Sequence, residues 1–367
     1  MRFTFIGTFN LDLSDSKAYK KGVTKTGSDY LSINPTIVEK QNNRMRCEMF
    51  GMKSNIIKTS NQNGEKIDIS WGDRKDSDVI KDVADYRKNF IVVGNERNEF
   101  ISTYDAIEYI AENLTNLNGK RVRVTGSTNK DFYQGKARDR FTINNITVIS
   151  DDDERKNNLN GRVVLYWDKS CIDAADFKSD KKLYINGFTS EYISDLKENR
   201  YVNTQLVFDC SKADFENEKH MKQIRLKLMQ MGLDYKDGKI VNNMKAKGYA
   251  VNEFSVHIVN GAEEVEFSID DCTDVQKMYI EAGLNTLDDF RPRGNLFGQW
   301  ITEYKIQGPT LTGNYTDGMS YIEDKPSEFE DMIYVPLMDE KADEALPFEE
   351  IMPAPIEEDE NEDDLFG

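Results

Sequence analysis

Several short segments of this sequence mix cationic and aromatic side chains. Phosphate groups need cationic partners and unstacked bases need flat apolar surfaces, so this mixture is typical of proteins that bind single-stranded nucleic acid. Each stacked base contributes roughly 1–3 kcal/mol to binding. For any one residue the alternative is structural, because Lys and Arg also solvate sheet faces and aromatic rings also fill cores. The candidate nucleic-acid-binding residues are Lys17, Tyr19, Lys20, Lys21, Arg44, Arg46, Phe50, Lys53, Trp71, Arg121, Arg123, Phe132, Tyr133, Lys136, Arg138 and Arg140.

The positive charge of these segments is local. The whole chain of 367 residues has a formal net charge of -18. Residues 323–367 hold 18 acidic residues against two lysines, which leaves 48 acidic and 46 basic residues in 1–322. Residues 1–60 and 120–147 each carry a net charge of +5. A local positive field holds an anion whatever the overall charge, so we expect these two segments to supply pieces of a binding groove.

Enzyme signatures are absent from the sequence. It contains no GxxxxGK[ST], HExxH or GxSxG motif. Its only histidines are His220 and His257, which we interpret as structural. The run Asp151–Glu154 lacks the spacing of a calcium loop and is interpreted as a solvated connection between domains. We therefore expect no enzyme activity, no cofactor and no metal, and a carboxylate nuclease that uses Mg²⁺ is the least favoured alternative.

Residue periodicity places the candidates of the first 150 residues on strands and loops. Strands are predicted near residues 1–9, 29–40 and 43–52, and in the last of these Arg44, Arg46, Glu48 and Phe50 alternate with Met45, Cys47 and Met49. A helix is predicted over residues 102–117, followed by strands near 120–126 and 140–150 with an exposed loop, 127–139, between them. Three strands, a helix and two strands are the order of an oligonucleotide-binding (OB) barrel.

A second β-rich domain, possibly also OB-like, is predicted for residues 160–322. Strand patterns near residues 161–167, 182–188, 203–210 and 249–259 surround a helix within 215–233, whose apolar stripe is Met221, Ile224, Leu228 and Met231. The predicted organisation is an OB-like nucleic-acid-binding domain in 1–150, a second β-rich domain in 160–322 and a disordered acidic tail in 323–367. The fold class is mainly β with a few helices.

The end of the chain resembles the acidic C-terminal tip of bacterial and phage single-stranded DNA-binding proteins (SSBs). In those proteins, acidic residues precede a short apolar tip that often ends Leu-Pro-Phe or Ile-Pro-Phe. Here the last residues are NEDDLFG, without the proline and with an added glycine, and an internal DEALPFEE holds the fuller triplet. The resemblance implies a divergent phage-type SSB, and the candidate partner-docking residues are Leu346, Pro347, Phe348, Asp363, Asp364, Leu365 and Phe366.

These observations predict a protein that coats single-stranded DNA in replication, recombination or repair and recruits partner proteins through its acidic tail. The alternative is a virion, assembly or adaptor protein whose tail docks a basic partner or mimics nucleic acid. Four widely spaced cysteines and the lack of a long apolar stretch predict a soluble, unexported protein of the cytoplasm, without a membrane partner. For a phage protein this would be the cytoplasm of the infected host.

Overall fold

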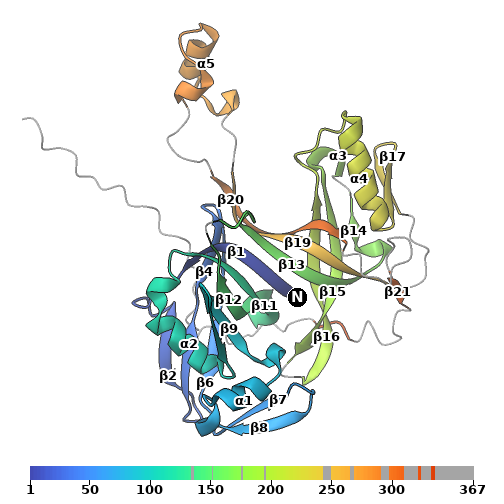
Figure 1. Cartoon of the computed structure of the whole chain (residues 1–367). Helices are drawn as coiled ribbons and strands as arrows, with labels where there is room; N and C mark the ends of the chain where they lie inside the picture. Colours follow the sequence, from blue (N-terminus) through green and yellow to red (C-terminus); the bar gives the residue numbers. More distant parts are fainter. Residues whose placement is uncertain are drawn as a thin grey trace, which may run out of the picture.

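The computed structural model describes residues 1–133, 136–150, 152–174, 177–193, 196–242, 249–264, 268–290, 297–309, 321–323 and 332–334. Within these ranges the chain is mainly β with a few helices, which confirms the predicted fold class (Figure 1). None of the helices described there combines the length and apolar character needed to cross a membrane.

The first barrel is built from β1 (Arg2–Asn10), β4 (Thr36–Lys40), β5 (Asn43–Arg46), β11 (Arg121–Tyr133) and β12 (Lys136–Val148). β1 pairs antiparallel with β4 and β11, β4 pairs with β5, and β11 pairs with β12. A parallel contact closes the barrel, because the Glu48 N–H donates to the Phe141 carbonyl and the Ile143 N–H to the Glu48 carbonyl, at 2.8 and 2.9 Å. Helix α2 (Thr103–Glu112) lies between the third and fourth barrel strands in the chain, as in an OB fold.

Smaller elements extend this barrel. β2 (Tyr19–Val23), β3 (Asp29–Ile33) and β6 (Met49–Met52) form a three-stranded sheet that continues from β5. β7 (Ile56–Ser60) and β8 (Lys66–Ser70) form a hairpin, followed by the 3-10 turn η1 (Trp71–Asp73) and α1 (Ser77–Asp82). β9 (Asn89–Val93) runs parallel to β12 and pairs with β10 (Glu96–Phe100).

The second barrel repeats this connectivity. β13 (Asn158–Trp167) pairs antiparallel with β15 (Lys182–Ile193) and β19 (Tyr249–Glu264), β15 with β16 (Glu198–Asp209), and β19 with β20 (Phe297–Pro309). β16 and β20 meet in parallel at Val207 and Lys305. Helix α4 (Glu218–Gln230) again lies between the third and fourth strands in the chain, and it buries Ile224 and Leu228 as predicted, with Met231 just beyond its end. The described part of the chain therefore contains two OB-type barrels in tandem.

Short elements decorate the second barrel. They are β14 (Ile172–Asp173), α3 (Phe177–Asp180), β17 (Leu233–Lys236), β18 (Lys239–Asn242) and β21 (Tyr321–Glu323). Helix α5 (Asp274–Glu281) lies in the chain between β19 and β20 and stands clear of the sheets (Figure 1).

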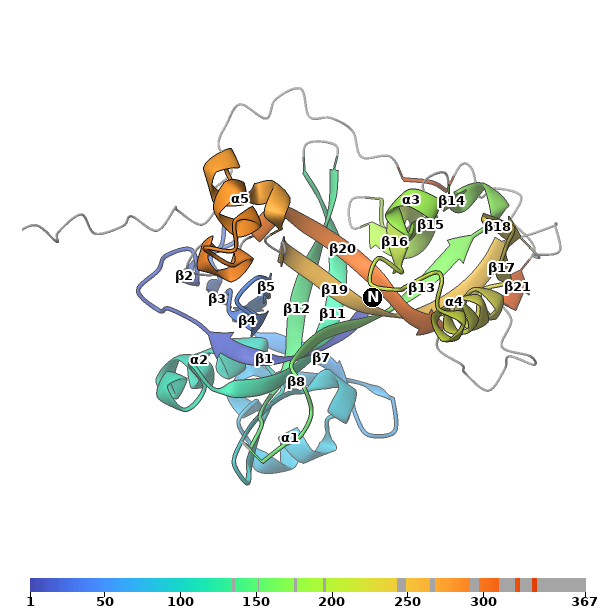
Figure 2. The ribbon, with the colours of Figure 1, turned by 90° about the horizontal axis from the view of Figure 1, so that it is seen from above.

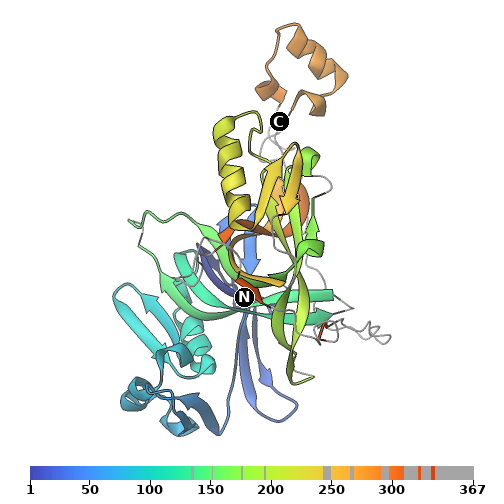
Figure 3. The same ribbon diagram turned by 90° about the vertical axis from the view of Figure 1, so that its right-hand side faces the viewer.

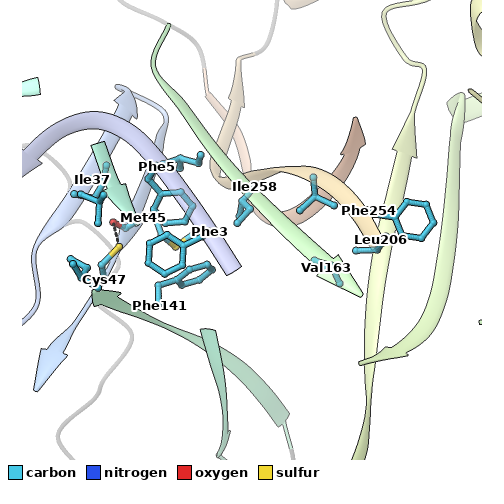
Figure 4. Packing of buried hydrophobic residues seen from close by; sticks show 14 of the residues in the cluster. Phe3, Phe5, Ile37, Met45, Cys47, Phe141, Val163, Leu206, Phe254 and Ile258 are labelled. Carbon is cyan, nitrogen blue, oxygen red and sulfur yellow. Dashed lines mark hydrogen bonds between the residues drawn. The ribbon is translucent and has the colours of Figure 1, made fainter. Parts of the chain in front are cut away.

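The two barrels share a sheet and a core. β1 pairs with β13 from Arg2 opposite Arg162 to Ile6 opposite Asn158. One cluster of buried side chains continues from Phe3, Phe5 and Phe141 in the first barrel to Phe254 in the second (Figure 4). At Gly261, an added Cβ would lie 1.8 Å from the Asn42 carbonyl oxygen, so the β4–β5 turn docks against β19 at a site that only glycine permits. The predicted boundaries of the three regions stay a prediction.

One difference from the sequence-based expectation concerns residues 127–139. The described residues of the predicted loop, 127–133 and 136–139, instead lie on two paired strands, since β11 and β12 pair continuously from Asn129 opposite Arg140 to Tyr133 opposite Lys136. Its polar residues find partners there. The Lys130 ammonium lies 3.0 Å from the Asp139 carboxylate, and Asp139 also accepts a hydrogen bond from the Tyr304 hydroxyl of the second barrel.

Candidate nucleic-acid interface

A line of outward-facing side chains runs along β5 and β6 on the first barrel. Arg44, Arg46, Glu48 and Phe50 point away from the core, and we call them the Arg44–Phe50 stripe. The intervening Met45, Cys47 and Met49 are almost completely buried, so the predicted alternation is confirmed. At about 3.3 Å per residue, the stripe is roughly 20 Å long. It lies on the third strand of an OB-type barrel, part of the face with which OB folds bind oligonucleotides.

An exposed aromatic stack marks one end of the stripe. The Phe50 ring, 51% exposed, stacks on the Tyr30 ring with centroids 5.5 Å apart and planes 29° apart. Tyr30 lies over Gly22, where an added Cβ would come within 2.9 Å of its ring. Met52, also exposed, shares this face, and Lys20 stands opposite Ser32, the cross-strand neighbour of Phe50. Sequence reasoning missed Tyr30, although Tyr30 and Ser32 alternate with the buried Leu31 and Ile33.

The other predicted residues near this end have mixed roles. Lys17 and Lys21 are exposed, and the Lys17 carbonyl accepts a 2.7 Å hydrogen bond from the Arg46 guanidinium. Tyr19 packs against the core. The Lys53 ammonium lies 2.9 Å from the Asp29 carboxylate and 5.1 Å from the Tyr104 ring centroid. The hydrogen bond to Asp29 raises the pKa of Lys53, which therefore stays protonated.

The second barrel contributes to the opposite end of the stripe. The Arg44 guanidinium carbon lies 5.6 Å from the centroid of the Trp300 ring, and Trp300, on β20, is 44% exposed. The Asn260 side-chain amide donates to the Arg44 carbonyl at 2.9 Å and so fixes the distance between the barrels here. Sequence reasoning missed Trp300. The alternation of this strand gave no signal for it, because Ile306 lies at the same alternation and is buried.

The β11–β12 hairpin lies next to the middle of the stripe. The Arg140 guanidinium forms an ion pair with the Glu48 carboxylate at 2.6 Å, and this hydrogen bond raises the pKa of Arg140. Arg138 is exposed and stands opposite Asp131. The Phe132 ring meets the Tyr334 ring edge to face, with centroids 4.6 Å apart. Tyr133 and Lys136 pair through their backbones, and their side chains lie outside the described residues.

Three predicted residues lie away from the stripe. Arg121 donates to the Asn157 side chain and to the Asp153 carbonyl, at 2.8 and 2.9 Å, so it fastens the connection between the barrels. Arg123 is exposed on β11. Around the barrel, β1 and β4 lie between β11 and β5 on one side, and β12 lies between them on the other. Trp71 is half-buried, with the Arg74 guanidinium 4.2 Å above its ring and Tyr104 at its edge. This packing corresponds to the structural alternative for Trp71.

Among the described residues, no group of three or more His, Cys, Asp or Glu side chains is arranged to hold a metal ion. All four cysteines are buried, and burial raises the pKa of Cys210 to about 12, so that thiol stays protonated. The predicted partner-docking residues, from Leu346 to Phe366, lie outside the described residues.

Together these features define a tandem OB-type protein with an aromatic and cationic stripe on the first barrel, whose Arg44 end reaches the second barrel. No protein-family model matches the chain, and no curated protein is recognisably similar to it in sequence. Among solved structures, the chain is similar to a deletion mutant of the single-stranded DNA-binding protein from Thermus aquaticus, at 9% identity. That match covers 71% of this chain and 86% of the other, with a TM-score of 0.27, which is too loose a likeness to support a functional conclusion.

Proposed function

We propose that this protein binds single-stranded DNA along the Arg44–Phe50 stripe. The observation that carries the proposal is the exposed Tyr30–Phe50 stack, flanked by basic residues on the outer face of an OB-type barrel. A half-exposed phenylalanine ring stabilises the fold less than a buried one, whereas it offers an unstacked base a flat apolar partner. Trp300 supplies a second such ring at the other end of the stripe.

The charge along the stripe suits a phosphate backbone. Glu48 is the stripe's only acidic residue, and its ion pair with Arg140 neutralises it. Arg44 and Arg46 therefore leave the stripe with a positive charge that can bind phosphates between the two aromatic ends. Exposed rings favour single strands over duplex, because the bases of a duplex are already stacked on one another.

We further propose that the acidic tail recruits partner proteins and that the chain acts in replication, recombination or repair. Support comes from the sequence, which places acidic residues next to an apolar tip at Leu365 and Phe366, with Leu346–Phe348 as the alternative anchor. Acidic residues would steer the tip to a basic pocket, and burial of each apolar side chain would contribute about 1.5–3 kcal/mol.

A salt-series titration tests DNA binding. Labelled poly(dT), the matching RNA and a duplex are titrated at increasing salt, and we expect single strands to bind more tightly than duplex. Each phosphate that is neutralised contributes about -0.7 to the slope of log affinity against log salt. Arg44→Gln and Arg46→Gln should each reduce the slope by about that amount. Arg123→Gln removes an exposed arginine from the far side of the barrel and is the matched control.

A salt-independent affinity, or equal affinity for duplex, would refute the proposed function. Wild-type slopes in both stripe variants, together with a reduced slope in Arg123→Gln, would instead place the binding surface on β11.

A further inference from the structure

A hollow of about 720 Å³ lies between the two barrels. The turn between β4 and β5 forms one wall, and α4, the end of β16, β19 and β20 form the others. β19 and β20 run between that turn and α4, and α4 lies along the outside of the second barrel (Figures 2 and 3). We call this cavity the inter-barrel hollow, and its basic lining residues are Lys40, Lys212, Lys227, Lys305, His220 and His257.

The hollow carries a positive charge. Asp209 is the only acidic residue among its described lining residues, and the Lys305 ammonium lies 2.6 Å from that carboxylate. The same ammonium lies 3.5 Å from the Glu303 carboxylate, which also pairs with Lys182 at 3.4 Å. Burial opposes ionisation of Asp209, but hydrogen bonds from Lys305 and Ser211 lower its pKa to about 2, so Lys305 adds no net positive charge to the hollow. Lys40, Lys212 and Lys227 are exposed, and within the described part of the chain none of the three forms an ion pair. These ammonium groups are available to an anion.

Both histidines of the chain line this hollow. His220 Nδ1 accepts a 3.1 Å hydrogen bond from the Asp214 N–H, so the neutral ring carries its proton on Nε2 and can donate it to a ligand oxygen. His257 Nε2 lies 3.0 Å from the Glu39 carboxylate of the first barrel, which holds its ring across the junction. His220, Ile224 and Lys227 follow one another at helical spacing, so α4 turns one face to the hollow.

The hollow begins where the stripe ends. Asn43 lines the hollow and directly precedes Arg44. Ala262 also lines it and is the cross-strand partner of Trp300 on the β19–β20 ladder. The Asn42 amide donates to the Ala262 carbonyl at 2.9 Å, which joins the two walls at this point. A strand that passes Arg44 and Trp300 therefore meets these lysines next.

We propose that the inter-barrel hollow is a phosphate-binding site, and that its ligand is the backbone of the single strand as it leaves the Arg44 end of the stripe. Ammonium groups and an imidazole N–H are suitable partners for phosphate oxygens. This inference rests on the proposed function and extends it from one barrel to the junction. The stripe binds bases and phosphates, whereas the hollow binds phosphates.

The test uses the full chain with ¹³C-labelled histidine and two dT strands. The short strand has about 5 nucleotides and the long one about 30, because one OB barrel occupies roughly 4–16. The chain has only two histidines and both line the hollow, so their ring signals report its occupancy. We expect the long strand to shift these signals and the short strand to leave them unchanged.

Charge variants supply the second measurement. Lys212→Gln with Lys227→Gln keeps the aliphatic stems and should reduce the salt slope for the long strand by about 1.4, with no change for the short one. Lys219→Gln with Lys222→Gln removes two exposed charges from α4 outside the hollow and should leave both slopes unchanged.

The outcomes separate this inference from the proposed function. The inference is wrong, and the proposed function stands, if the long strand binds without shifting the histidine signals and the Lys212→Gln, Lys227→Gln variant keeps the wild-type salt slope. If neither strand binds, the proposed function fails. A histidine shift with inorganic phosphate but with neither strand would overturn the choice of ligand.

Discussion

Replacing Phe50 with alanine tests the feature on which the function is proposed. A base stacked on an aromatic ring contributes about 1–3 kcal/mol, so Phe50→Ala should weaken binding of dT strands by about 5- to 150-fold. The ring is 51% exposed, and truncation should cost about 1 kcal/mol of folding stability, roughly half the value for a fully buried phenylalanine. Fluorescence anisotropy at fixed salt measures the affinity, and thermal unfolding confirms that the variant is folded.

The neighbouring residues provide matched controls. Met52→Ala truncates an exposed apolar side chain on the same strand and the same face, but it removes no ring. Phe50→Tyr keeps a ring and should bind nearly as well as the wild type. The salt slope should be the same in all three variants, because none of them removes a charge. An unchanged affinity for Phe50→Ala, or an equal loss for Met52→Ala, would refute stacking at this position.

Three further predictions address other parts of the chain. Trp300→Phe should remove most of the tryptophan quenching caused by poly(dT), whereas Trp71→Phe should leave it, and the reverse result would return the stacking role to Trp71. The lowered pKa of Asp209 gives stability that is present above the unfolded-state pKa near 3.8 and is lost as pH falls toward about 2. Over that pH range, the free energy of unfolding in urea should therefore fall by about 2 kcal/mol less in Asp209→Asn than in the wild type. Deleting residues 340–367 should raise DNA affinity at low salt and have less effect at high salt, and a loss of DNA binding would contradict the proposed competition between tail and DNA. Leu365→Ala with Phe366→Ala should abolish partner capture and leave DNA binding unchanged.

The alternating segments were predictable because burial selects every second residue of a barrel strand. Met45, Cys47 and Met49 have to face the core, which turns Arg44, Arg46 and Phe50 outward whatever the rest of the fold is. The apolar stripe of α4 was predictable for the same reason, at helical spacing. The order of strands and helix then indicated an OB barrel before any pairing was known.

Contacts between the barrels could not be predicted from the same patterns. The Arg44–Trp300 pair depends on how β19 sits against the β4–β5 turn. The Asn42 and Asn43 side chains fix that position by hydrogen bonds to the β19 backbone, and Gly261 permits the close approach. Residues 127–139 looked like a loop because they are polar. Residues 127–133 and 136–139 lie on strands, where the Lys130–Asp139 ion pair and the Tyr304 hydroxyl satisfy part of their polar groups at the barrel junction.

The shared sheet gives the proposed interface its main energetic advantage. If a flexible linker joined the barrels, binding one strand across both would have to order the barrels as well as the DNA, and that ordering opposes association. Here β1 and β13 pair directly, and the Asn260 side chain holds Arg44 in place beside Trp300. The stripe and the inter-barrel hollow are therefore fixed relative to each other before DNA binds, and the strand alone has to be ordered. A net charge of -18 does not oppose the proposed binding of a polyanion at this surface. The cations of the stripe and the hollow lie on a preformed surface, while most of the excess negative charge lies in residues 323–367.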